Sequence, residues 1–210
     1  MRQSRPMSKF EVRDDENGIG KVLILQSAWS EEIESYMLKK NIFALRLSDS
    51  FGFKDTDLTF LSGLKFLKSL EVYCWDAKNI KAIESLTQLE VIGLQFKSQQ
   101  KLNFTGFDKL RVAGVTWTKG LTSIFTLKSI EKLNIQNYPN TDLIQISQMT
   151  LLQKLYLTSR KLQSLNGVSN FKELKLLDLY NCPQLTSTNG IEACTKLKTI
   201  EIEACRNLSA

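Results

Sequence analysis

The 210-residue chain contains no histidine. That absence excludes serine–histidine–aspartate and cysteine–histidine nucleophile systems, HExxH zinc sites and acid–base catalysis by imidazole. Carboxylates, lysines and cysteines also serve as catalytic groups in enzymes, so the absence lowers the expectation of catalysis without closing it. We therefore expect a non-enzymatic protein.

Long apolar runs are also lacking. The opening segment MRQSRPMSKFEVRDD has no apolar core of the kind that a signal peptide needs, and no later segment approaches the roughly 18 uncharged apolar residues of a membrane span. Only four cysteines are present and none forms a CxxC pair, so reduced thiols are expected. These features predict a soluble protein located in the cytoplasm.

The excess of basic over acidic residues is diffuse. The formal net charge is +6, but the basic excess is spread along the chain. A diffuse excess of this size does not by itself predict nucleic-acid binding, for which a basic stripe or patch is typical.

The chain does contain a repeated sequence motif. Leu152, Leu155 and Leu157 form an LxxLxL pattern that returns 22 residues later at Leu174, Leu177 and Leu179. The middle position of the pattern occurs eight times, at intervals of 25, 22, 21, 20, 22, 22 and 23 residues: Leu45, Leu70, Ile92, Ala113, Leu133, Leu155, Leu177 and Ile200. A fixed period of this length indicates a repeat architecture.

Alternation within each unit, as in Leu155-Tyr156-Leu157, is typical of a strand with one buried face. The rest of each unit has apolar residues at wider spacing, which suits a short helical or extended return path. A single unit leaves its apolar face uncovered, and stacking buries that face against the neighbouring units. The sequence therefore predicts a curved solenoid with a parallel sheet on its inner side.

These residues resemble the leucine-rich repeat family, in particular the 22-residue bacterial type of internalins, LxxLxLxxNxIxxIxxLxxL. The resemblance implies an α/β leucine-rich repeat solenoid over about residues 42–208, with the parallel sheet on the concave face. The chain departs from the family at the ninth position, where Asn is favoured; that position holds Trp75, Lys97, Tyr138, Arg160, Cys182 and Cys205. We expect the hydrogen-bond ladder along this turn to be irregular.

The chain is expected to form one structural domain in three parts. Residues 1–8 are predicted to be disordered, residues 9–41 to form an N-terminal cap, and residues 42–210 to hold about eight repeats. The cap reads as a hairpin with strands at residues 10–13 and 21–26 around an Asn17-Gly18 turn, then a helix capped by Ser30 and ending near Lys39 and Lys40. No amphipathic capping helix follows the last repeat, so its edge should be thinly protected.

For three short motifs we favour a structural role over a catalytic or ligand-binding one. The segment NGIGK lacks the helix that a phosphate-binding loop requires, so it is predicted to be a hairpin turn. Asp55 and Asp57 lack the spacing of a calcium loop and are expected to cap or to be solvated. Cys182 and Cys205, with Cys194, are interpreted as buried thiols, the alternative being a redox pair or a soft-metal site. We expect no metal and no cofactor.

The residues on either side of the buried strand leucines should form the concave surface. The middle of this surface is predicted to be small and uncharged, whereas its C-terminal end gathers acids and tyrosines, a combination suited to a basic protein. Solvation of the sheet and protection of its edge is the alternative role for the acids. The residues predicted to bind a partner are Glu71, Tyr73, Gln95, Lys132, Gln136, Lys154, Tyr156, Asp178, Tyr180, Glu201 and Glu203.

A second pattern is basic and lies at the starts of the predicted strands. It is composed of Lys65, Lys68, Lys109, Arg111, Lys128, Lys172, Lys175, Lys196 and Lys198. These residues, the basic rim, suit phosphate tracking, but arginines and stacking aromatics are sparse among them, which favours a solvated rim that discourages aggregation.

The sequence thus favours a protein-binding module that captures and occludes one protein on its concave face. The resemblance extends to leucine-rich repeat immunity proteins that neutralise bacterial toxins, which implies a basic, nuclease-like toxin domain as partner. Three alternatives stay open: a nucleic-acid or anionic-surface binder that uses the basic rim, an enzyme that uses Asp178, Glu201 and Glu203, and a fragment of a larger scaffold. Neither the oligomeric state nor the identity of the partner follows from the sequence.

Overall fold

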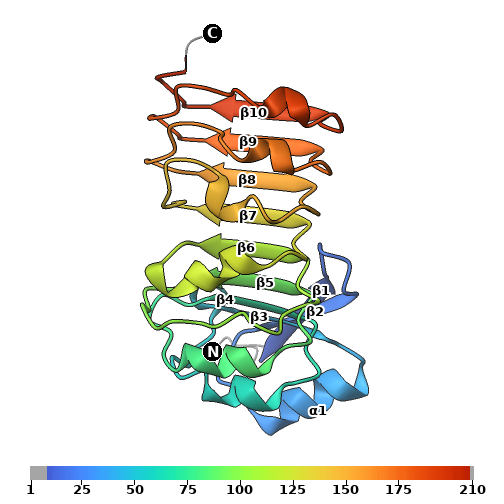
Figure 1. Cartoon of the computed structure of the whole chain (residues 1–210). Coiled ribbons are helices and arrows are strands. Elements are labelled where there is room, and N and C mark those ends of the chain that lie inside the picture. The colour runs from blue at the N-terminus through green and yellow to red at the C-terminus, as the bar shows by residue number, and fades with distance from the viewer. Residues whose placement is uncertain (1–8, 209–210) are drawn as a thin grey trace, which may run out of the picture.

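Ten strands follow one another in a single sheet whose spatial order is the order of the sequence (Figure 1). This computed structural model describes residues 9–208, so the disorder predicted for residues 1–8 lies outside the described residues. The strands are β1 (Phe10–Asp14), β2 (Lys21–Leu25), β3 (Ala44–Ser48), β4 (Ser69–Tyr73), β5 (Val91–Gln95), β6 (Val112–Thr116), β7 (Lys132–Gln136), β8 (Lys154–Thr158), β9 (Leu176–Tyr180) and β10 (Thr199–Glu203). Strands β2 to β10 pair in parallel, which confirms the predicted solenoid.

The predicted register is also confirmed. The middle residue of each LxxLxL pattern is paired with the middle residue of the next, as Leu133 is with Leu155 and Leu155 with Leu177. All of these residues from Leu45 to Leu177 are at most 1% exposed. One face of every strand therefore supplies the core, and the alternate residues lie on the other face.

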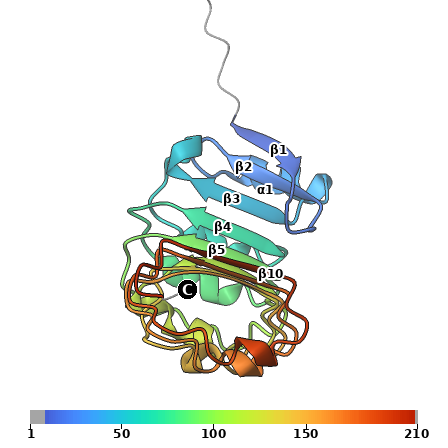
Figure 2. The ribbon, with the colours of Figure 1, turned by 90° about the horizontal axis from the view of Figure 1, so that it is seen from above.

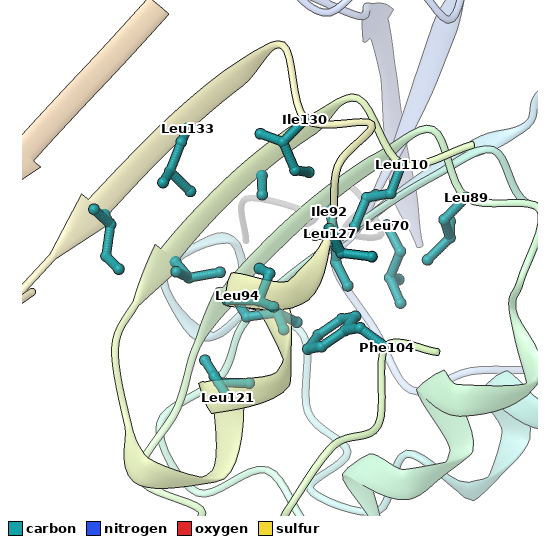
Figure 3. Close-up of a cluster of buried hydrophobic side chains, with 14 of the residues drawn as sticks. Leu70, Leu89, Ile92, Leu94, Phe104, Leu110, Leu121, Leu127, Ile130 and Leu133 are labelled. Atoms are coloured by element: carbon teal, nitrogen blue, oxygen red, sulfur yellow. The ribbon is translucent and has the colours of Figure 1, made fainter. Parts of the chain in front are cut away.

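Short 3-10 helices line the side of the solenoid opposite the sheet. They are η1 (Asp49–Phe51), η2 (Thr59–Gly63), η3 (Ile80–Ser85), η4 (Lys119–Thr126), η5 (Ile144–Ile146), η6 (Val168–Asn170) and η7 (Ile191–Ala193). Their apolar residues meet the strand residues inside, as Leu121 of η4 meets Leu94 in Figure 3, where Phe104 from the loop between β5 and β6 joins the same cluster. Among residues 9–208, no helix has both the length and the apolarity needed to cross a membrane.

The N-terminal segment contains the predicted hairpin and helix. Strands β1 and β2 pair antiparallel, and β2 joins the parallel sheet through β3. The loop between β1 and β2 is longer than an Asn-Gly turn: the Asp15 N–H donates to the Gly20 carbonyl at 2.8 Å, and the positive φ values fall at Gly18 and Gly20. The Asp15 carboxylate organises this loop by accepting hydrogen bonds from the N–H groups of Asn17 and Ile19 at 2.9 and 3.0 Å.

Helix α1 (Glu31–Lys39) begins where predicted but is not capped as predicted. Ser30 occupies the N-cap position, yet its hydroxyl makes no capping hydrogen bond and is buried without a partner. Three acids in the first turn and Lys39 in the last remain to complement the helix dipole. Ile33 and Met37 bury the inner face of the helix against the first strands.

The turn after the strands has the irregular ladder that the ninth position predicted. Tyr138 is buried there and donates its hydroxyl to the Asp142 carbonyl at 2.8 Å. In the next repeat Ser159 takes over, donating to the Tyr138 carbonyl at 2.7 Å and accepting from two N–H groups. Cys182 and Cys205 contact the Leu157 and Leu179 carbonyls at 4.0 and 3.9 Å, so thiols continue the ladder.

The last repeat is less well covered than those before it. Ile200 takes the position that is buried in the preceding repeats, but it is 52% exposed because no further strand lies beyond β10 among residues 9–208. Ile202 and Cys205 are only partly buried. The described C-terminal edge therefore has the thin protection that the sequence predicted.

Candidate functional site

The concave face consists of three rows of side chains that run across the sheet. The register aligns one row through the strand middles, Arg46, Glu71, Gly93, Gly114, Asn134, Tyr156, Asp178 and Glu201. The eleven residues predicted to bind a partner all fall on these rows, because strand alternation places them there. Their surroundings differ sharply between the two ends of the sheet.

At the N-terminal end, charge on the concave face is already satisfied. The Arg46 guanidinium pairs with the Glu71 carboxylate, and Glu71 is only 6% exposed. Tyr73 lies beside this pair, and burial together with the Glu71 charge raises the pKa of its hydroxyl to about 12. Glu71 is thus held inside the fold, whereas Tyr73 presents a neutral phenol to the face.

Two glycines on adjacent strands have opposite roles. A Cβ atom on Gly93 would lie 2.6 Å from the Tyr73 hydroxyl oxygen and 3.0 Å from the Glu71 Cγ, so only glycine lets these side chains fold across β5. A Cβ atom on Gly114 would meet nothing within 4 Å. The space over Gly114 is open, and two hollows of about 210 and 220 Å³ share Tyr73, Gly114 and Asn134 in their linings.

The tip of the N-terminal hairpin reaches this part of the face. Arg111, at the start of β6, donates to the Asn17 carbonyl at 3.0 Å, and Glu16 and Asn17 line the larger of the two hollows. The tip lies beside the solenoid in Figure 1, and Figure 2 shows β1 to β4 fanning out from the stacked later strands. Sequence reasoning missed Glu16, Asn17 and Arg111 as neighbours, since no local pattern indicates a contact across 94 residues.

At the C-terminal end of the face Glu201 and Glu203 are exposed, Asp178 is half-buried, and all three charges are free. Asp178, Glu201 and Glu203 have no ion pair or side-chain hydrogen bond with any of residues 9–208. Tyr180 is 53% exposed and lies next to Glu203 across the β9–β10 pair. An acidic surface with an exposed aromatic side chain is the arrangement that the sequence predicted here.

Lys132, Lys154 and Tyr156 connect the two ends. The Lys132 ammonium lies 5.9 Å from the centroid of the Tyr156 ring, a cation–π contact that keeps the ring half-buried. Lys154 is exposed and has no acidic partner among residues 9–208. Gln95 and Gln136 are exposed on the third row, where the Thr116 hydroxyl donates to the Gln136 side-chain oxygen at 3.1 Å.

About half of the basic rim is engaged by neighbouring side chains. Contacts of 2.5–3.7 Å join five of its nine cations to other side chains: Lys68 and Arg111 to Glu90, Lys109 to Gln88, Lys175 to Gln153 and Lys196 to Glu173. A stripe that tracks phosphates needs cations that are free to release counterions. These contacts favour the interpretation of the rim as a solvated edge.

The Cys182 and Cys205 thiols lie side by side, as their equivalent repeat positions predict, and both are reduced. Burial raises the pKa of the Cys74 and Cys182 thiols to about 12, and burial also raises the pKa of Cys194. All four cysteines are free, Cys205 being only partly buried, and residues 9–208 contain no group of three potential ligands in metal-binding geometry. Asp57 accepts hydrogen bonds from the N–H and hydroxyl groups of Thr59 at the start of η2, but Leu58 and not Asp57 occupies the N-cap position.

Solved structures with the same architecture exist. Internalin C2 from Listeria monocytogenes matches 86% of this chain and 80% of its own, with a TM-score of 0.62 and 21% sequence identity. The chain has the leucine-rich repeat fold. A second Listeria monocytogenes internalin, inlF, matches 86% of this chain and 66% of its own with a TM-score of 0.48 and 21% identity.

A more distant leucine-rich repeat structure, the plant peptide hormone receptor RGFR1 in complex with RGF2, matches 98% of this chain and 55% of its own with a TM-score of 0.35 and 14% identity. No protein-family model and no curated protein matches the sequence. At this level of identity the likeness to internalin C2 shows the fold alone.

Proposed function

We propose that the chain is a non-enzymatic protein-binding module that captures a protein partner on its concave face. The observation that carries the proposal is the contrast between engaged and free charge. Five of the nine cations of the basic rim contact other side chains, and three of these five contact carboxylates, whereas Asp178, Glu201 and Glu203 on the concave face have no partner among residues 9–208. Free carboxylates on a rigid sheet face attract a cationic surface.

The partner that fits this end of the face is a basic protein. Tyr156 and Tyr180 flank the carboxylates, and aromatic side chains of this kind supply much of the binding energy at interfaces. Strands spaced about 4.8 Å apart over eight repeats give a face nearly 40 Å long, enough for a standard interface of roughly 800 Å² per partner. Nothing in residues 9–208 stands out as catalytic, so simple occlusion is the mechanism we propose.

The finer form of the proposal is that of an immunity protein that neutralises a basic bacterial toxin domain in the cytoplasm. Four unpaired cysteines suit a reducing compartment. A toxin domain that binds nucleic acid would present the cationic surface that the acidic end requires. This form is tested by the identity of the captured protein.

The experiment is a pull-down from nuclease-treated native lysate in moderate salt, with bound proteins identified by mass. Three baits are compared: the unchanged chain, a concave-face variant Tyr156→Ala/Asp178→Lys/Glu201→Lys, and a rim variant Lys172→Glu/Lys198→Glu. We expect one stoichiometric basic partner that the concave-face variant loses and the rim variant keeps. Loss only in the rim variant, or an unchanged set of bound proteins, would contradict the proposal.

A further inference from the structure

The open space over Gly114 is a trough that runs along β6. Its floor is the three outward-facing residues of that strand, Val112, Gly114 and Thr116, which line the two hollows on either side of Gly114. Tyr73 forms one wall, and Asn134 of β7 forms the other. A five-residue strand spans about 16 Å, so the trough has the length of a short extended segment.

We propose that this trough binds an extended peptide segment of a protein partner, with the main chain of the segment lying over Gly114 and uncharged residues at its centre. The inference rests on the proposed function, because it assigns a subsite of the same concave face. The two subsites would recognise different parts of the partner. The trough would bind neutral main chain, whereas the acidic end would bind cationic side chains.

The polar groups around the trough suit main-chain amides. Gln95, Asn134 and Gln136 each carry both a donor and an acceptor, as a peptide group does. Thr116 donates to the Gln136 oxygen, and the Gln136 NH₂ group has no partner among residues 9–208, so it can donate to a carbonyl. A peptide whose N–H and C=O groups are buried here therefore finds partners and avoids the cost of leaving them unpaired.

Charge argues against an ionic group at the centre of the trough. The hollow toward the strand ends is lined only by uncharged residues. The other hollow is lined by two cations and two carboxylates, Arg46, Lys132, Glu16 and Glu71, and Arg46 pairs with Glu71. An ion desolvated over Gly114 would therefore meet no excess of opposite charge. The Tyr73 hydroxyl neither donates nor accepts a hydrogen bond within residues 9–208, so it is available to the incoming segment.

Gly114 also makes the inference testable without breaking the fold. A side chain there meets open space and places a strand-favouring residue in a strand, so Gly114→Val should fill the trough and leave the thermal midpoint unchanged or higher. Gly114→Ala should fill it less. Gly93→Val is the matched control for a change on the adjacent strand, because it must displace Tyr73 and should lower the midpoint.

The probe is a library of random peptides displayed on phage. The bait is the Tyr156→Ala/Asp178→Lys/Glu201→Lys chain, so that the acidic end cannot select the peptides. We expect enriched sequences with uncharged centres, and synthetic copies that bind the unchanged chain by fluorescence anisotropy. Gly114→Val should weaken that binding by about tenfold or more, with Gly114→Ala between the two.

Three results would overturn the inference. They are no enrichment over bare matrix, enriched peptides with charged centres, and equal affinity for the unchanged chain and a folded Gly114→Val variant. These results leave the pull-down unaffected, since that experiment changes only the acidic end. Failure of the trough and failure of the proposed function are therefore separable.

Discussion

Strands β4 to β6 and strands β9 to β10 present the same three outward-facing positions but use them differently. In the first region the charges are paired, a phenol folds over a glycine, and the hairpin tip closes one side. In the second, Glu201, Glu203 and Tyr180 are exposed, Asp178 is half-buried, and the last core position is half open. One repeat pattern thus builds a rigid, recessed surface and a charged, loosely covered one.

The largest difference is expected in thiol reactivity. With a pKa near 12, Cys74 after β4 has a thiolate population about a thousandfold below that of an ordinary thiol, and burial blocks access as well. Cys205 after β10 is only half-buried. Titration with a thiol reagent should therefore give one fast thiol in the native chain and four in denaturant. Rapid native labelling of Cys74, Cys182 and Cys194 would contradict the burial.

Truncation of a core side chain should lower the free energy of unfolding by several kcal/mol more in the well-covered repeats than in the last repeat. Leu155→Ala removes a fully buried side chain and should cost about 2–5 kcal/mol of unfolding free energy. Ile200→Ala, at the equivalent position of the exposed repeat, should cost about 1 kcal/mol or less. Chemical denaturation measures both. Tyr156→Ala is the control for register: if it destabilised as much as Leu155→Ala, the assignment of inner and outer faces would be wrong.

Removal of a carboxylate should show which charges belong to the fold. Glu71→Gln leaves the Arg46 guanidinium without its partner and should cost on the order of 2 kcal/mol, between the values for surface and buried pairs. Asp178→Asn breaks no contact and should change stability by less than about 0.5 kcal/mol. Equal midpoints for the two variants in urea would mean that the Arg46–Glu71 pair does not stabilise the concave face.

The smallest effect concerns the turn after β10. Ala204 has a φ of 54°, and Asn181 holds the same position and the same φ after β9. Alanine in this conformation is strained where asparagine is tolerated, so Ala204→Asn should stabilise the chain by up to about 1 kcal/mol. Ala193→Asn in η7 is the control, and it should give no gain. A loss of stability in Ala204→Asn would show that the turn is not strained.

The sequence predicted the repeat from its period. It also predicted the strand register and the placement of all eleven candidate residues, because the alternation of buried leucines with outward-facing residues determines these two together. It also located the hairpin and the helix from local turn and capping signals. The Ser30 hydroxyl did not cap as expected, since the actual hydrogen bonding at a helix end depends on side-chain rotamers that composition does not specify.

Other features depend on contacts between distant repeats. Glu71 looked like an exposed binding residue, but Arg46 on the adjacent strand holds it inside the fold. The different roles of Gly93 and Gly114 follow from the direction that the Tyr73 ring takes, which the sequence does not show. The contact from Asn17 to Arg111 depends on the curvature of the whole sheet.

The most direct test of the concave-face account is carboxylate footprinting with and without the captured partner, read by mass spectrometry. In the chain alone Glu201 and Glu203 are exposed and Asp178 is half-buried, and Glu192 in η7 lies away from the face as an internal reference. The account predicts that the partner suppresses labelling of the three concave acids and leaves Glu192 unchanged. Unchanged labelling of the three acids in the complex would place the partner on another surface and contradict the account.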